Sequence, residues 1–124
     1  MDITPVIHKG RQSITGYGDG KFRIGGEDYF TSVLVFPDRV VEWVIAPGAP
    51  ITLENLQVVL EEEGEIDLVL IGCGKRQDIL PPIIRNELKE VGIAMEVMDT
   101  GAACRTYNVL LSEGRRVAAA LIAV

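Results

Sequence analysis

Apolar and polar residues alternate over the first third of the chain, and their spacing changes after it. Between Ile14 and Ile45, short alternating runs are separated by glycine-rich turns at residues 16–20 and 25–28. Alternation with a period of two is typical of half-buried strands, and tight turns join antiparallel neighbours. This part of the chain therefore predicts an antiparallel meander, with strands at residues 22–24, 29–36 and 39–45.

The middle of the chain has the spacing of alternating helices and strands. Residues 52–63 carry leucines and valines at helical intervals after Thr52, a residue that caps helices well. Residues 68–71 are a continuous apolar run, as expected of a strand that is buried on both faces. A helical pattern at 82–91 and a second apolar run at 93–98 follow. Strand, helix and strand at this spacing predict a βαβ unit with parallel strands.

The last quarter of the chain predicts a helix followed by a strand. Asp99 and Thr100 are short polar residues of the kind that cap a helix, and Gly114 suits the left-handed residue that closes one. At about 100° per residue, the apolar residues between them share one face. Cys104, Arg105 and Asn108 fall on the other face, so we expect them to meet solvent. Residues 116–123 are the expected closing strand.

Composition and charge exclude several classes of protein. The chain has 124 residues, 48% of them apolar, which suits a single α/β domain over residues 1–124. Its 12 basic and 18 acidic residues give a net charge of −6, which argues against a general binder of nucleic acid or anionic membranes. The sequence shows no signal peptide and no transmembrane segment. We therefore expect a cytoplasmic protein.

Two loops follow the predicted parallel strands and are the candidate ligand-binding elements. Gly72-Cys73-Gly74-Lys75-Arg76 follows the first strand, and Asp99-Thr100-Gly101 follows the second. Ligands of open α/β sheets gather beyond the carboxyl ends of the strands, so both loops are expected to open on one side. The two glycines do not make a dinucleotide fingerprint, which requires a third glycine and an immediate helix. Tight packing of the turn is the alternative explanation for them.

The two cysteines, Cys73 and Cys104, are too few for a disulfide framework or a zinc site. A nucleophilic thiolate requires a neighbouring base, cation or helix N-terminus. Cys104 lies early in its helix and Cys73 precedes Lys75, but the only histidine, His8, belongs to a loose N-terminal segment and is expected to be an ordinary surface residue. We expect both thiols to be reduced, with no bound metal or cofactor.

Charged residues stand before the closing strand and have two explanations. Arg115 and Arg116 present planar forks suited to phosphates and carboxylates, so they suit an anion or an acidic partner. Alternatively, they pair with Asp99 or Glu113 as structural ion pairs. The run Glu61-Glu62-Glu63, at the end of the earlier helix, indicates either a solvated acidic face or an external cation or partner.

Several stretches resemble a known family. They are Met98-Asp99-Thr100, Ala103-Cys104-Arg105-Thr106-Tyr107-Asn108, Glu113-Gly114-Arg115-Arg116-Val117-Ala118-Ala119-Ala120-Leu121, Gly72-Cys73-Gly74, and Trp43 after Phe36-Pro37. Over nearly its whole length the chain is similar to the small domain of mitochondrial respiratory complex I assembly factors and adipogenesis-associated domain proteins. The resemblance implies a three-layer α/β domain with a central mixed, mostly parallel sheet, flanking helices and an N-terminal antiparallel β layer. It also implies that the last strand opposes its neighbours.

The same resemblance implies a role in assembling the respiratory NADH:quinone oxidoreductase. The expected partners are subunits of that complex or a second assembly factor, and no reaction or cofactor comes with the family. Because the sequence shows no mitochondrial transit segment, it resembles a bacterial member, either cytoplasmic or held at the inner face of the membrane by a partner.

Two functions therefore stand as hypotheses. The leading one is a non-enzymatic protein-interaction domain; the alternative is a binding module or enzyme for a small anionic ligand at the strand-end loops. We expect one surface to carry binding under either hypothesis, and we assign no catalytic or metal-binding residue. Its candidate residues are Gly72, Cys73, Gly74, Lys75, Arg76, Asp99, Thr100, Cys104, Arg105, Asn108, Glu113, Arg115 and Arg116.

Overall fold

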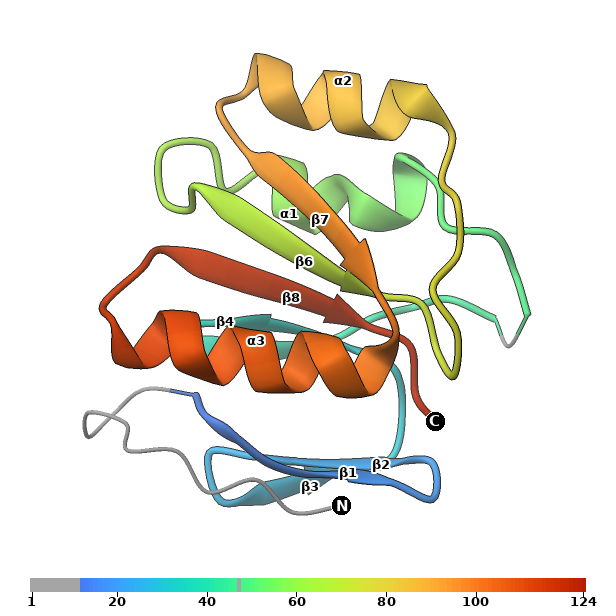
Figure 1. The fold of residues 1–124 in the computed structure, drawn as a ribbon, viewed down its shortest axis with the longest axis vertical. Coiled ribbons are helices and arrows are strands. Elements are labelled where there is room, and N and C mark those ends of the chain that lie inside the picture. Colours follow the sequence, from blue (N-terminus) through green and yellow to red (C-terminus); the bar gives the residue numbers. More distant parts are fainter. Residues whose placement is uncertain (1–11, 47) are drawn as a thin grey trace.

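One helix, α3 (Thr100–Ser112), lies between two β-sheets, and the other helices cover the opposite face of the larger sheet (Figure 1). The computed structural model describes residues 12–46 and 48–124. His8 lies outside the described residues, so its predicted surface position stays a prediction.

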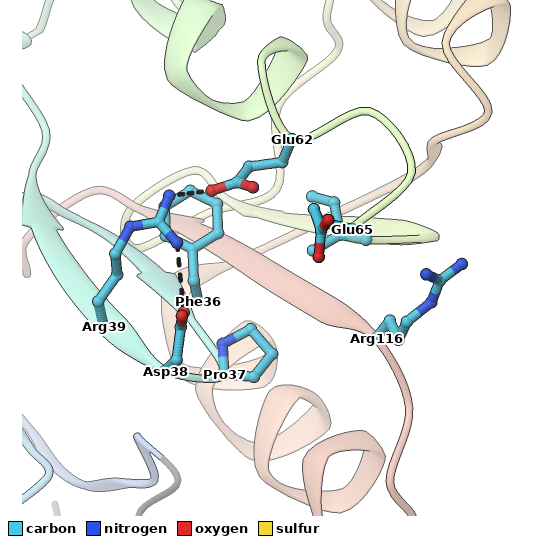
Figure 2. Close-up of a pocket in the computed structure, with 8 residues that line it drawn as sticks. Phe36, Pro37, Asp38, Arg39, Glu62, Glu65 and Arg116 are labelled. Carbon is cyan, nitrogen blue, oxygen red and sulfur yellow. Dashed lines mark hydrogen bonds and ion pairs between the residues drawn. The ribbon is translucent and has the colours of Figure 1, made fainter.

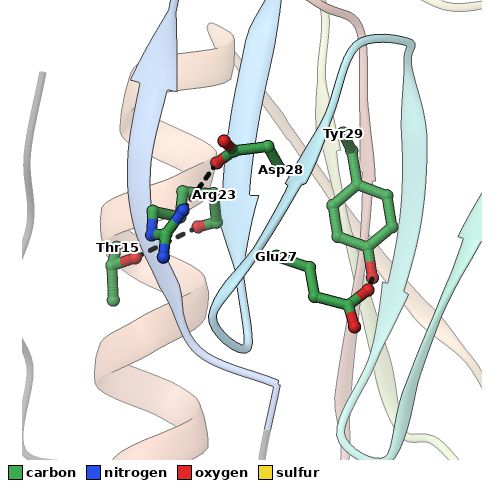
Figure 3. A network of polar contacts seen from close by, with 5 residues as sticks. All are labelled: Thr15, Arg23, Glu27, Asp28 and Tyr29. Atoms are coloured by element: carbon green, nitrogen blue, oxygen red, sulfur yellow. Dashed lines mark hydrogen bonds and ion pairs between the residues drawn. The ribbon is translucent and has the colours of Figure 1, made fainter.

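The smaller sheet is an antiparallel meander that holds only part of the predicted one. Residues 33–36 and 39–42 belong to the larger sheet, and residues 16–18, predicted as part of a turn, continue the first strand. It consists of β1 (Ile14–Gly18), β2 (Lys21–Ile24) and β3 (Glu27–Tyr29), hydrogen-bonded in that order. Phe22 and Ile24 are fully buried and pack with residues of α3, so the intervening Arg23 faces outward. On this outer face Arg23 pairs with Asp28 at 2.9 Å (Figure 3). The alternating pattern thus places one face of the sheet on the core and the other in water.

The larger sheet contains five strands in the order β5-β4-β8-β6-β7. Their bounds are β4 (Val33–Phe36), β5 (Arg39–Glu42), β6 (Leu68–Gly72), β7 (Ala94–Met98) and β8 (Val117–Leu121). β6 and β7 are parallel and are joined through α2 (Pro82–Glu90), which confirms the predicted βαβ unit. The expected mixed sheet is also present, since β4 alone of the five runs against the others.

The last strand does not oppose both of its neighbours, so that expectation was wrong. β8 is antiparallel to β4 and parallel to β6. The helix before β8 returns the chain to the edge where β6 begins, and β8 therefore runs in the same direction as β6. All residues of β8 are buried, and its alanines allow helices to approach both faces closely.

Two predicted elements are broken in the structure. The expected strand at 29–36 divides at Phe30–Ser32, where the chain crosses from the smaller sheet to the larger one. The expected helix at 52–63 is a 3-10 turn, η1 (Glu54–Leu56), followed by a short α1 (Gln57–Leu60). Thr52 was predicted as the N-cap, but Leu53 holds that position; the Thr52 Oγ1 still accepts from the Asn55 N–H at 3.3 Å.

The larger sheet has a hydrophobic core on each face. On one face, Leu56 and Val59 from η1 and α1 and Ile84 and Leu88 from α2 pack on the strands. On the other face, the buried side of α3 packs between the two sheets. The mixed sheet with helices on both faces and a β layer outside α3 confirms the expected fold class.

Because α3 is covered on two sides, two side chains expected in solvent are buried. Cys104 is 0% exposed and Asn108 is 3% exposed, so the prediction of a solvated face was wrong for both, while Arg105 is exposed. Asn108 Oδ1 accepts from the Ile14 N–H at 2.9 Å, and Asn108 Nδ2 donates to the Ile14 carbonyl at 2.6 Å. One amide side chain thereby joins α3 to the first strand of the smaller sheet.

Replacing this amide should loosen the contact between helix and sheet. We expect Asn108→Ala to lower the free energy of unfolding by about 2–4 kcal/mol, because a buried N–H and a buried carbonyl lose their partner. Val109→Ala is the matched control: Val109 is 56% exposed on the same helix, and its truncation should cost less than about 0.5 kcal/mol. Urea denaturation measures both, and equal midpoints for the two variants would contradict the assignment.

Candidate functional site

The strands β5, β6, β7 and β8 all end at one edge of the larger sheet, which we call the carboxyl edge. The loop after β6, the start of α3 and the C-terminal residues meet there, on the right-hand side of Figure 1. The structure therefore brings together Gly72–Arg76 and Asp99–Arg105, as predicted from the rule for parallel strands.

Thr100 holds the carboxyl edge together from a fully buried position. Its hydroxyl accepts from the Gly74 N–H at 2.9 Å and donates to the Ile122 carbonyl at 2.8 Å. Its own N–H donates to the Gly74 carbonyl at 2.8 Å. Asp99 begins the helix as predicted, with its Oδ1 accepting from the Ala102 N–H at 2.8 Å. These hydrogen bonds fix the ends of β6 and β8 against α3. Because Thr100 is fully buried, its hydroxyl does not face solvent.

The glycines of this edge are explained by close packing. A Cβ on Gly72 would lie 3.0 Å from the Thr100 Cα and 3.2 Å from the Ala103 Cβ, so α3 sits directly on the strand end. Gly74 has φ +103°, a backbone conformation that favours glycine. The packing explanation therefore accounts for Gly72, and backbone geometry accounts for Gly74.

A small hollow opens where the two loops meet β1. It has a volume of about 290 Å³, and its lining includes Tyr17, Lys75, Asp99 and Arg105. Arg105 Nη1 donates to the Tyr17 hydroxyl at 2.7 Å, so the arginine also tethers the first turn of α3 to the smaller sheet. Lys75 and Arg76 are exposed on the loop. The exposed cations of this edge are therefore available to an anion or to an acidic partner surface.

The thiols at this edge are poor nucleophiles. Burial raises the pKa of the Cys104 thiol to about 12, against a smaller opposing effect of Arg105. Burial also raises the pKa of Cys73. A thiol must lose its proton to attack, so the structure disfavours the cysteine chemistry that the helix N-terminus and Lys75 had left open. The two sulfurs are not joined in a disulfide.

Glu113, Arg115 and Arg116 lie at the other end of α3, about 20 Å away for a 13-residue helix. Arg116 binds Asp67 through two contacts, of 3.1 and 2.6 Å, and donates to the Gly64 carbonyl at 2.6 Å. Both partners of this pair are more than half exposed, so it is a surface ion pair. The expectation of one surface that includes these residues was wrong, and so was the pairing of Arg116 with Asp99 or Glu113.

A second hollow at this opposite edge was not predicted. It measures about 480 Å³ and lies between Arg39, Glu62 and Arg116 (Figure 2). The Arg39 guanidinium pairs with Glu62 and lies 4.2 Å from the centre of the Phe36 ring. Glu62, the middle residue of the acidic run Glu61-Glu62-Glu63, thus pairs with a cation of the same chain, Arg39. Its 15% side-chain exposure distinguishes it from a solvated acidic residue.

Sequence reasoning also missed the apolar residues exposed near the carboxyl edge. Phe30 is 75% exposed, Val44 83% and Ile79 93%. Phe30 precedes β4, whose start pairs with the end of β8, while Val44 follows β5 and Ile79 lies in the loop after β6. The sequence did contain a signal for them. Large apolar residues are unusual in turns, which favour Gly, Pro, Asn, Asp and Ser, so their presence there could have indicated a binding surface.

A known protein family matches most of the chain. The family model described as "Protein of unknown function (DUF498/DUF598)" matches residues 14–122. The chain belongs to this family. An uncharacterised protein from Rhodobacter capsulatus is 38% identical over 113 residues, which cover 91% of this chain and 86% of that protein.

Other relatives carry a functional name. NADH dehydrogenase (ubiquinone) 1 alpha subcomplex assembly factor 3 of Danio rerio is 38% identical over 109 residues, which cover 88% of this chain. Those residues span 63% of the Danio rerio protein, so the chain matches less than two thirds of it. The predicted resemblance to complex I assembly factors is therefore confirmed.

Solved structures confirm the fold of the DUF498/DUF598 chain. The crystal structure of an outer membrane protein from Bartonella henselae superimposes with a TM-score of 0.85 at 41% identity, covering 93% of this chain and 97% of that one. Within residues 12–46 and 48–124, none of the helices has the length and apolar character needed to cross a bilayer.

The buried thiol of Cys104 predicts a specific response to alkaline pH. The folded state keeps the proton until about pH 12, whereas the ordinary pKa of the thiol is 9.0. The contribution of this protonated thiol to the free energy of unfolding is fully present below pH 9. It is lost as pH rises toward 12, and the loss reaches about 2–3 kcal/mol by pH 11. We expect Cys104→Ala to flatten the fall in unfolding free energy between pH 8 and 11. Parallel pH profiles for parent and variant would contradict this.

Proposed function

We propose that this chain is a protein-interaction domain that takes part in assembling a respiratory NADH:quinone oxidoreductase. The observation that carries the proposal is the likeness to animal proteins named as complex I assembly factors, at 36–38% identity in Danio rerio and Bos taurus over 109 residues. Because the chain spans only part of those proteins, their partners are assigned to it here as a proposal.

The carboxyl edge is the surface we assign to partner binding. Phe30, Val44 and Ile79 are exposed at this edge, and so are Lys75 and Arg76. Aromatic residues and arginine are enriched in protein interfaces. Exposed apolar groups also carry a solvation cost, which a partner that covers them would remove.

The residues predicted at this edge then divide into two roles. Thr100, Asp99 and the two glycines at 72 and 74 shape the edge from within the fold. Lys75, Arg76 and Arg105 are exposed and can meet the partner directly. Arg115 and Arg116 fall outside this surface, and their charges support contacts only at the opposite edge.

A binding module for a small anion is the second candidate function. The observation that favours it is the hollow of about 290 Å³ beside Lys75 and Arg105. A ligand that binds only the native state raises the melting temperature, and the stabilisation grows with the logarithm of its concentration above the dissociation constant. Titration with inorganic phosphate separates the two candidates: a concentration-dependent rise that Lys75→Ala removes supports the anion module, and an unchanged melting temperature supports the interaction domain.

Affinity purification from the native host tests the leading proposal. We expect the tagged parent to recover subunits or assembly proteins of the oxidoreductase, and Ile79→Asp to recover about tenfold less, because a charge then occupies the apolar surface. Val109→Asp is the control, because Val109 is also exposed but lies on the solvent side of α3, away from the assigned surface. We expect it to recover as much partner as the parent does.

The same variants have an assembly readout. In a strain that lacks the gene, the parent and Val109→Asp should restore the assembled oxidoreductase on native gels, and Ile79→Asp should not. Full restoration by Ile79→Asp with unchanged partners would overturn the assigned surface. Normal assembly in the strain without the gene would overturn the proposed function.

A further inference from the structure

The two residues that follow β8 bind neighbours on opposite sides. The Ile122 N–H donates to the carbonyl of Gly72, the last residue of β6, at 2.9 Å. The Ala123 N–H turns toward β4 and donates to the Ser32 hydroxyl oxygen at 3.0 Å. The end of β8 therefore connects the β6 side of the carboxyl edge to the β4 side.

Ser32 acts where the backbone ladder between β4 and β8 ends. The last pair of that ladder joins Val33 to Leu121. Before Val33 the chain leaves the larger sheet and crosses to the smaller one, so no backbone carbonyl of a continued strand meets Ala123. The Ser32 side chain supplies the acceptor instead, and it thereby ties the crossing segment, which carries exposed Phe30, to the end of β8.

The same serine fixes the segment after β5. Its carbonyl accepts from the Trp43 N–H at 2.9 Å. Trp43 is 2% exposed, and its indole N–H donates to the Asn55 carbonyl at 2.5 Å. Trp43 is thus held both by its backbone and by its side chain, and this placement leaves the next residue, Val44, exposed to solvent.

Thr100 makes the corresponding connection on the β6 side. Its hydroxyl donates to the Ile122 carbonyl and accepts from the Gly74 N–H. Gly74 begins the loop that carries Ile79 toward α2. The hydroxyls of Ser32 and Thr100 therefore bind adjacent residues of the same short segment, and each of them holds a part of the edge that carries an exposed apolar side chain.

We infer that Ser32 and Thr100 are positioning residues of the partner-binding surface. Their hydroxyls hold the three segments that carry Phe30, Val44 and Ile79 in one arrangement before a partner binds. This inference deepens the proposed function and rests on it, because it names the groups that prepare the surface assigned to the partner.

A surface prepared in this way binds more tightly than one that becomes ordered only in the complex. Ordering of loops and side chains on association opposes binding, and the apparent dissociation constant rises as the fraction of molecules in the binding arrangement falls. The loss of one hydrogen bond typically changes such an equilibrium about fivefold. A hydroxyl that served stability alone would leave binding per folded molecule unchanged.

Backbone order parameters from NMR relaxation of the full chain test the positioning role without a partner. In the parent we expect values of about 0.85 at Phe30 and Val44, as in rigid backbone, and a fall toward about 0.6 in Ser32→Ala. Leu70, in the buried centre of β6, should keep its parental value in the variant. A loss of stability alone would not lower the order parameters of the folded state.

Affinity purification tests the binding role. We expect Ser32→Ala to recover about fivefold less of the oxidoreductase proteins per folded molecule than the parent does. Ser112→Ala is the matched control, because the Ser112 hydroxyl donates to the Val109 carbonyl at the far end of α3 and its loss should leave recovery at the parental level. Thr100→Ser, which keeps the hydroxyl, should recover more than Thr100→Val, which keeps the shape without it.

The outcomes separate this inference from the proposed function. Unchanged order parameters at Phe30 and Val44 in Ser32→Ala would overturn the positioning role. Lowered order parameters with parental recovery would overturn the link to binding and leave the proposed function standing. A parent that recovers no protein of the oxidoreductase would overturn the proposed function and the binding role together, while the order parameters would still decide whether Ser32 holds the two segments.

Discussion

The structure depends on the placement of α3 between two sheets. Polar side chains on the two covered sides of this helix cannot reach water, so each of them must find a partner within the fold. Asn108 meets both backbone groups of Ile14, and Thr100 meets Gly74 and Ile122. These contacts cross between elements far apart in the sequence. We infer that they make the two sheets one folding unit.

The carboxyl edge follows from the same constraint. Close approach of α3 to β6 requires glycine at position 72, and the buried Thr100 hydroxyl fixes the loop at Gly74. Residues that resemble a ligand loop in the sequence therefore act as supports. What remains exposed on the loop, such as Lys75 and Ile79, is what a partner can meet. Residues that pack within the fold, such as Gly72, therefore stand next to residues that we assign to partner binding, such as Lys75.

Much of this arrangement could be predicted from local patterns. The apolar run at 68–71 and the caps at Asp99 and Gly114 carry their meaning in adjacent residues, and α3 begins and closes at them as expected. The burial of Asn108 could not be predicted, since its partner Ile14 is 94 residues away. The separation of Arg116 from Asp99 did have a signal, because a helix of this length holds its ends about 20 Å apart. The position of β7 at the edge of the larger sheet required the strand order, which no local pattern contains.

Amide hydrogen exchange tests most directly whether α3 joins the two sheets. Its two reporters are the Ile14 N–H, bonded to Asn108, and the Gly74 N–H, bonded to Thr100. If α3 makes one folding unit, both should exchange with the opening free energy of Leu70 in the buried centre of β6, which reports global unfolding. A much lower opening free energy at Ile14, with β6 still protected, would show that the smaller sheet opens by itself and would contradict the account.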